Sequence, residues 1–237
     1  MQFRAIIFDM DGTIIDTTGI WKSVTHEVIE SRGHIITPDI ARELEEKLHG
    51  CAMNRSCQIL KDIFDLAEPV EMIMQEKKNR ANARYQQQID FVTGFTEFHY
   101  QASNVHQLRT AIATNATDCT LKITVEKLSL ERYFGTHIYN ITHVNNVPKP
   151  EPDLYLHAAE QLNVEPELCI AIEDSAHGIA AAKAAGMYCI GINTGGDENQ
   201  LRESDMIIQG YKDIYLPKLL HDILPYEQRN EKNLHRN

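Results

Sequence analysis

The chain has 237 residues, of which 43% are hydrophobic and 24% are charged. This composition excludes a chain that is disordered throughout, and the length suits one large domain or a core with a smaller insert. The 34 acidic and 23 basic residues give a formal charge of −11. Such a charge offers no general electrostatic attraction to nucleic acid or to anionic membranes, so we expect neither as a partner.

The cysteines indicate a reducing environment. There are five of them, an odd number, at irregular spacings and without a Cys-x-x-Cys pair. Neither a disulfide framework nor a zinc ribbon fits that pattern. The first residues lead directly into a predicted strand without a signal peptide, and no apolar stretch approaches the roughly 20 residues of a membrane span. We therefore expect a cytoplasmic protein, and we expect it to be a monomer.

Short β-rich apolar runs predict the strands of a sheet. Four of them are almost uninterrupted by polar residues, which is typical of parallel strands covered on both faces. Because helices alternate with the later strands, the sequence predicts an α/β fold with a doubly wound, Rossmann-like parallel sheet. The predicted strands span residues 5–8, 110–114, 138–141, 169–172, 188–192 and 206–208, and the clearest helices span residues 116–130, 152–162 and 176–185.

A long helical segment separates the first two predicted strands. It has about a hundred residues, whereas a crossover between parallel strands needs only a dozen or more. We therefore expect a helical domain inserted at residues 17–90, a catalytic core formed by residues 1–16 and 91–225, and a mobile polar tail at residues 226–237. Helical patterns within the insert cover residues 20–31, 39–48, 55–66 and 69–88.

Two carboxylates, Asp9 and Asp11, end the first predicted strand and are followed at once by Gly12. Burying two carboxylates at a strand end is costly unless a cation or hydrogen bonds compensate. One interpretation is a metal-bound nucleophile with a neighbouring acid/base. The other is an Asp-Gly turn that merely ends the strand.

Two further signals point to an anion-binding site. Thr114 and Asn115 end the second strand just before a helix, where free N–H groups and the Thr114 hydroxyl can bind an anion, although such residues are also common N-caps. Lys149 lies between Pro148 and Pro150, which restrict its backbone. A Lys held in this way suits a phosphoryl oxygen, and the alternative is an exposed loop residue before a helix that begins with proline.

A second acidic pair, Glu173 and Asp174, ends the fourth predicted strand. Asp174 or the following Ser175 could simply cap the next helix, but carboxylate oxygens are also the ligands that Mg2+ prefers. All four signals fall at the carboxyl ends of predicted strands or just after them, where open α/β sheets bind ligands. Their coincidence favours one site for metal-assisted phosphoryl transfer over several unrelated structural explanations.

Four stretches of sequence carry these signals: FDMDGTIID at residues 8–16, ATNAT at 113–117, KPEPD at 149–153 and IEDSAHGIAAAKAAGM at 172–187. Together and in this order they resemble the haloacid dehalogenase superfamily, in the branch of small phosphatases similar to β-phosphoglucomutase. The resemblance covers the predicted core, and the insert matches only in position and helical character. It implies a phosphatase that acts on a small phosphorylated metabolite, with residues 17–90 as a cap domain.

The resemblance also implies a role for each site residue. Asp9 would attack phosphorus and carry an aspartyl-phosphate, and Asp11 would exchange protons with the leaving group and the incoming water. The implied Mg2+ ligands are Asp9, the backbone carbonyl of Asp11, Asp174 and, through water, Glu173; the implied phosphate-binding residues are Thr114, Asn115 and Lys149.

Two departures from the mutase of that branch favour hydrolysis. The mutase has a cap His shortly after the first motif, where this sequence has Trp21, and a cap Arg shortly after a Gly, whereas here Gly50 and Arg55 are in a different register. A sugar-phosphate mutase is therefore the alternative enzyme, and a metal-binding, non-catalytic phospho-acceptor is the alternative of another class. A dehalogenase is disfavoured because halide leaves without a proton and does not need Asp11.

Overall fold

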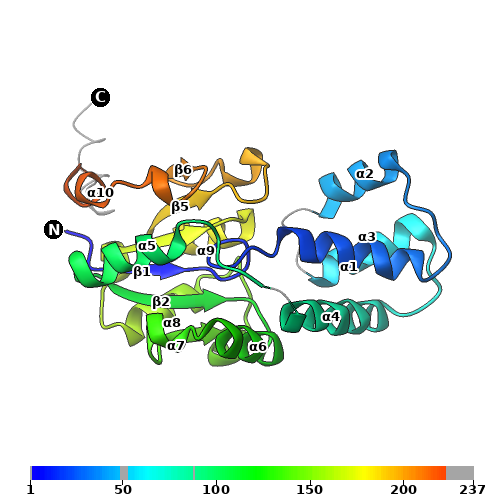
Figure 1. Ribbon diagram of the computed structural model, residues 1–237, viewed down its shortest axis with the longest axis horizontal. Coiled ribbons are helices and arrows are strands. Elements are labelled where there is room, and N and C mark those ends of the chain that lie inside the picture. The colour runs from blue at the N-terminus through cyan, green and yellow to red at the C-terminus, as the bar shows by residue number, and fades with distance from the viewer. Residues whose placement is uncertain (1, 49–52, 88, 223–237) are drawn as a thin grey trace. The chain divides into compact units, whose positions relative to one another are not determined.

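The computed structural model describes residues 2–48, 53–87 and 89–222 (Figure 1). These residues divide into two compact units. Residues up to Asp16 and from Asp90 onward form an α/β unit, and Thr17–Ile89 form a helical unit. The tail predicted at residues 226–237 lies outside the described residues.

The α/β unit is built on a sheet whose described strands are six in number and all parallel. The order β3-β2-β1-β4-β5-β6 places β1 at the centre, between β2 and β4. Every residue of β1, β4 and β5 is buried, as near-continuous apolar runs predict. The predicted α/β fold with a doubly wound parallel sheet is confirmed. The strands are β1 (Ala5–Phe8), β2 (Arg109–Thr114), β3 (Ile138–Asn140), β4 (Cys169–Glu173), β5 (Tyr188–Ile192) and β6 (Met206–Ile208).

Different helices cover the two faces of this sheet, because successive side chains of a strand point to opposite faces. Ile7 belongs to the same buried cluster as Leu154 of α8 and Ile179 of α9. Its neighbour Phe8 points to the other face and meets the ring of Phe95 of α5 edge-on, at 5.7 Å between ring centroids. The helices of this unit are α5 (Phe95–Tyr100), α6 (Asp118–Leu128), α7 (Glu131–Phe134), α8 (Asp153–Gln161), α9 (Ala176–Ala184) and α10 (Leu216–Asp222).

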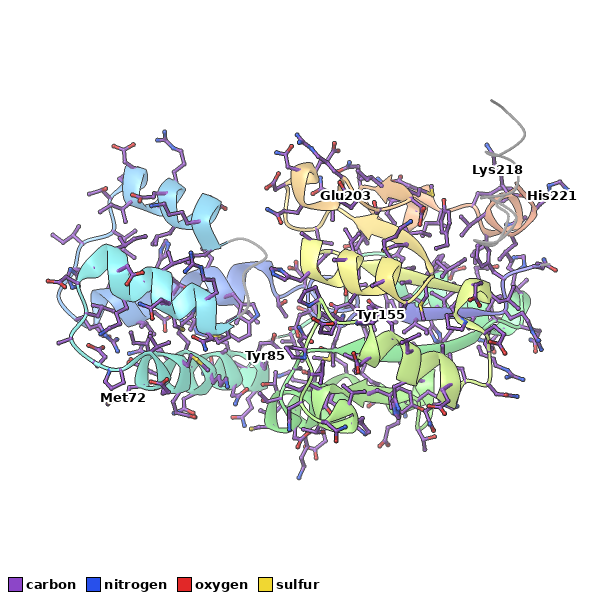
Figure 2. All side chains as sticks on the ribbon, turned by 180° about the vertical axis from the view of Figure 1, so that it is seen from behind. Met72, Tyr85, Tyr155, Glu203, Lys218 and His221 are labelled. Carbon is purple, nitrogen blue, oxygen red and sulfur yellow. The ribbon has the colours of Figure 1, made fainter. Side chains whose placement is uncertain are left out.

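The helical unit contains α1 (Thr18–Glu30), α2 (Pro38–Leu48), α3 (Met53–Phe64) and α4 (Val70–Gln87), close to the predicted segments. Helix α4 packs against both α1 and α3. Glu27 of α1 accepts hydrogen bonds from Arg80 and Arg84 of α4. Trp21 of α1 meets the ring of Tyr85 of α4 edge-on, and Figure 2 labels Tyr85. An ion-pair network and an aromatic contact therefore join the first and last helices of this unit.

The structure differs from the predicted elements at two places in the α/β unit. The helix predicted at residues 116–130 begins later, because Thr117 is the N-cap, and ends earlier, because Ser129 adopts a left-handed backbone conformation. Helix α5 and the π-helical turn that follows it (Gln101–Val105) have no counterpart among the predicted elements. In the described parts of the chain, every helix is too short or too polar to cross a membrane.

His99 of α5 is a buried polar residue in the aromatic layer on one face of the sheet. Its Nε2 atom lies 3.1 Å from the Thr110 hydroxyl, and its ring meets that of Phe134 edge-on at 4.9 Å between centroids. Burial lowers the pKa of His99 to about 4. The native state therefore holds this imidazole neutral at pH values where the unfolded chain would protonate it.

This difference predicts a pH-dependent loss of stability. Because the native pKa of His99 is below the unfolded value, its contribution is complete above pH 6.5 and declines as the pH falls toward 4. Between pH 7.5 and pH 5 the free energy of unfolding should fall by on the order of 2 kcal/mol more in the wild type than in a His99→Gln variant. Urea unfolding of both proteins at the two pH values measures this difference. Equal losses in the two proteins would contradict it.

Candidate active site

The carboxyl ends of three neighbouring strands carry predicted site residues. Asp9 directly follows β1, Thr114 is the last residue of β2, and Glu173 is the last residue of β4. Lys149 comes from the loop between the 3-10 turn η2 (Ile141–Val144) and α8. The parallel strand order therefore gathers the four motifs at one edge of the sheet.

The ammonium group of Lys149 connects Asp9 of the first acidic pair to Glu173 of the second. Its Nζ atom donates hydrogen bonds to Asp9 Oδ1 at 2.6 Å, to Glu173 Oε1 at 2.5 Å and to the hydroxyl of Tyr155 at 3.4 Å. The Lys149 side chain is only 3% exposed. Burial alone would lower the pKa of Lys149, but the carboxylates of Asp9 and Glu173 raise it above its usual value. The amine therefore stays charged.

Glu173 is fully buried, and protein donors contact both of its carboxylate oxygens. Oε1 accepts from Lys149 and from the Tyr155 hydroxyl, the latter at 2.8 Å. Oε2 accepts from the backbone N–H of Asp174 and from both the N–H and the hydroxyl of Ser175. A Cβ atom added at Gly178 of α9 would lie 1.8 Å from Glu173 Oε1, so the carboxylate fits only because this residue is glycine.

Asp9, Glu173 and Asp174 place carboxylate oxygens within 4.8 Å of one another. Burial raises the pKa of Asp9 to about 7, against the opposing effect of Lys149. Desolvation and then the neighbouring Asp9 raise the pKa of Asp174 well above its usual value. When these three carboxyl groups are ionised, their negative charge exceeds the single positive charge of Lys149, and a divalent cation would offset the excess. A donor set of carboxylate oxygens suits Mg2+.

The turn after Asp9 fits closely around the second acidic pair. Gly12 has a φ of +78°, and a Cβ atom there would lie 2.0 Å from Asp174 Oδ2. The Gly12 carbonyl accepts a hydrogen bond of 2.6 Å from the Thr194 hydroxyl. Asp11 is half-buried, and its charge adds to the rise in the pKa of both Asp9 and Asp174.

Thr114 and Asn115 link the end of β2 to its neighbours. The Thr114 hydroxyl is buried and accepts a hydrogen bond of 3.0 Å from the backbone N–H of Ala116. Asn115 Oδ1 accepts from the backbone N–H of Lys149, also at 3.0 Å. The amide of Asn115 thus holds the backbone of the loop that presents Lys149.

Three further residues contribute to this edge of the sheet without having been predicted: Tyr155, Gly178 and Thr194. Tyr155, labelled in Figure 2, lies on α8 and is fully buried. Thr194 follows β5, so the rule that singled out strand ends could have found it. Gly178 could have been noticed as a glycine inside a predicted helix, because glycine destabilises a helix by about 1 kcal/mol relative to alanine and usually has a packing or functional reason there.

Trp21 and Arg55, which depart from the mutase pattern, both belong to the helical unit. Trp21 is half-buried and meets the ring of Tyr85 edge-on, with 6.3 Å between ring centroids. Arg55 lies exposed on α3. Gly50 lies outside the described residues.

Comparison with known proteins identifies the family. A family model described as haloacid dehalogenase-like hydrolase matches residues 6–192. The chain is 30% identical to a phosphorylated carbohydrates phosphatase of Thermotoga maritima over 187 residues, which cover 78% of this chain and 82% of that one. It is also 30% identical to the β-phosphoglucomutase of Bacillus subtilis over 233 residues, which cover 92% and 94% of the two chains.

A solved structure agrees with these matches. A family hydrolase from Deinococcus radiodurans, crystallised with bound phosphate and sodium, superposes with a TM-score of 0.73 at 27% identity and covers 93% of this chain and 96% of its own. The family resemblance predicted from the four motifs is confirmed. The chain belongs to the haloacid dehalogenase-like hydrolase family and lies among its β-phosphoglucomutase-like phosphatases.

Proposed function

We propose that this protein is a Mg2+-dependent phosphatase that hydrolyses a small phosphorylated carbohydrate through an aspartyl-phosphate on Asp9. The observation that carries the proposal is the buried Asp9 carboxylate, held by Lys149 and close to Glu173 and Asp174. Relatives named as a phosphorylated carbohydrates phosphatase and a fructose-1-phosphate phosphatase support the substrate class.

In the proposed reaction an Asp9 oxygen forms a bond to phosphorus while the bond from phosphorus to the sugar oxygen breaks. Asp11 donates a proton to that leaving oxygen. Water then attacks the aspartyl-phosphate and gives its proton to Asp11, which releases inorganic phosphate and restores both carboxyl groups. Thr114, Asn115 and Lys149 hold the phosphoryl oxygens during both steps.

Charge repulsion explains why a cation is needed. A phosphate dianion and a carboxylate repel each other by about 4 kcal/mol at 4 Å with an effective dielectric constant near 20. Mg2+ would supply positive charge that offsets this repulsion. Its proposed ligands are Asp9, the backbone carbonyl of Asp11 and Asp174, with Glu173 acting through water. We also propose that the helical unit, Thr17–Ile89, is the cap that selects the substrate.

A β-phosphoglucomutase activity is the second candidate, because the similarity to the Bacillus subtilis enzyme extends over 92% of this chain. A mutase must protect its aspartyl-phosphate from water until the intermediate has turned round. It must also bind its substrate in two orientations, which requires polar groups on the cap. Trp21 stands where the mutase pattern has a polar residue, and this favours the phosphatase.

Replacing Asp9 tests its proposed role as the nucleophile. Asp9→Asn should lower the rate of phosphate release by at least about 10³-fold. The substitution keeps the shape of the side chain, but the amide cannot attack phosphorus. Phosphate release from p-nitrophenyl phosphate and from sugar phosphates with Mg2+ measures the effect. Asp39→Asn, at an exposed position on α2, is the matched control and should keep wild-type activity. Wild-type turnover by a folded Asp9→Asn protein would exclude the covalent mechanism.

Replacing Asp174 should affect stability differently with and without Mg2+. Without the metal, Asp174→Asn should be more stable than the wild type. The substitution removes a carboxyl group whose pKa is raised in the native state, which means that its ionised form is unfavourable there. With Mg2+, the variant should gain less stability, and its affinity for the ion should be at least about tenfold lower. Thermal unfolding and calorimetric titration give both numbers. Equal Mg2+ affinities in the two proteins would remove Asp174 from the ligand set.

Product analysis separates the two candidate enzymes. With β-glucose 1-phosphate and a panel of other sugar phosphates, inorganic phosphate should form faster than any isomerised sugar phosphate. Phosphate detection and chromatography of the sugar phosphates, on the same samples, measure the two rates. Faster isomerisation than phosphate release would promote the mutase.

A further inference from the structure

Tyr155 of α8 contacts both Lys149 and Glu173 in the α/β unit. Its hydroxyl accepts a hydrogen bond from Lys149 Nζ at 3.4 Å and donates one to Glu173 Oε1 at 2.8 Å. The Nζ atom also lies 4.9 Å from the centre of the Tyr155 ring, within the range of a cation–π interaction. Since Lys149 also bonds to Glu173 directly, the three side chains form a closed triangle.

This triangle uses the Lys149 ammonium group completely in the described conformation. A Lys has three N–H donors, and here they point to Asp9 Oδ1, Glu173 Oε1 and the Tyr155 hydroxyl. When a phosphoryl group binds to Asp9, Lys149 must turn a donor toward a phosphoryl oxygen. The contacts with Glu173 and Tyr155 can persist through that change, because neither partner is the nucleophile.

Glu173 is well suited to be the fixed corner of the triangle. Its Oε2 atom is held by Asp174 and Ser175 at the start of α9, and Gly178 leaves room for the carboxylate against that helix. Its Oε1 atom depends on two donors, Lys149 and Tyr155. If the Tyr155 hydroxyl were missing, Oε1 would keep only Lys149 of these two donors, and the Glu173 carboxylate would draw the ammonium group toward itself.

We propose that the Tyr155 hydroxyl is a positioning group that shares Glu173 Oε1 with Lys149 and so keeps the ammonium group directed toward the phosphoryl site. The inference rests on the proposed function, since it gives Lys149 a phosphoryl oxygen to hold. Tyr155 touches no reacting atom and acts through Glu173 and Lys149. Its loss should therefore weaken phosphoryl binding more than Mg2+ binding, because its hydrogen bonds go to Lys149 and Glu173, and Glu173 is proposed to reach the metal only through water.

The test compares Tyr155→Phe with Tyr139→Phe. Tyr139 of β3 is also buried, and its hydroxyl lies 2.9 Å from His137 Nδ1, so the control removes a hydrogen-bonded hydroxyl of the same kind. Tyr155→Phe should lower kcat/KM about tenfold, raise KM, and weaken binding of inorganic phosphate in the presence of Mg2+ by a similar factor. Its Mg2+ affinity should change less than its phosphate affinity, and Tyr139→Phe should match the wild type in every kinetic constant.

A double-mutant cycle with Glu173→Gln tests whether Tyr155 acts through Glu173. In the Gln background, Tyr155→Phe should have little further effect on kcat/KM or on phosphate affinity. Fully additive losses would overturn the inference, as would a Tyr155→Phe protein whose constants equal those of the wild type. A loss of activity accounted for by a smaller folded fraction in thermal unfolding would also overturn it.

The proposed function and this inference fail in different ways. A wild-type protein that binds phosphate with Mg2+ but releases none from any ester would refute the phosphatase. Calorimetric binding of inorganic phosphate by the four proteins of the cycle would still support or overturn the role of Tyr155.

Discussion

Buried negative charge at the carboxyl edge of the sheet is the constraint on which the site depends. Asp9 and Glu173 are buried at the ends of two adjacent central strands, and Lys149 forms ion pairs with both. An isolated carboxylate in such surroundings costs several kcal/mol, and the raised pKa of Asp9 shows that Lys149 does not offset the whole cost. A fold that retains such an arrangement is expected to use it, because strongly shifted pKa values gather at functional sites.

The strand order makes this concentration of charge possible. Because β1 lies between β2 and β4, Asp9 at the end of β1 lies beside the ends of two strands that are more than a hundred positions away in the sequence. Two glycines then make the fit possible at close range. Gly12 leaves space for the Asp174 carboxylate and Gly178 leaves space for that of Glu173. A Cβ atom at either position would overlap a carboxylate oxygen. The acidic pair thus depends on glycines in two different segments.

The sequence predicted the strands, their parallel arrangement and the residues at their ends, because these follow from local patterns of apolar and polar residues. It did not predict Tyr155, whose contact with Glu173 depends on the angle at which α8 packs on the sheet. Nor could it predict α5, because this short helix shares its segment with a π-helical turn and lacks the length of a periodic pattern. In the helical unit, helix positions followed from periodicity. The pairing of Glu27 with Arg80 and Arg84 depended on which faces α1 and α4 turn toward each other.

The overall charge of −11 does not conflict with an anionic substrate. At physiological ionic strength, exposed charges farther than about 8 Å away are largely screened, so the groups within the site decide the local potential. Lys149 is buried and therefore weakly screened, and the backbone N–H groups of Asp174 and Ser175 are directed at Glu173. These N–H groups partly neutralise the deepest carboxylate from the side of α9. Because these N–H groups already compensate part of the charge of Glu173, more of the positive charge of Lys149 acts on Asp9 and on the phosphoryl group that Asp9 is proposed to receive.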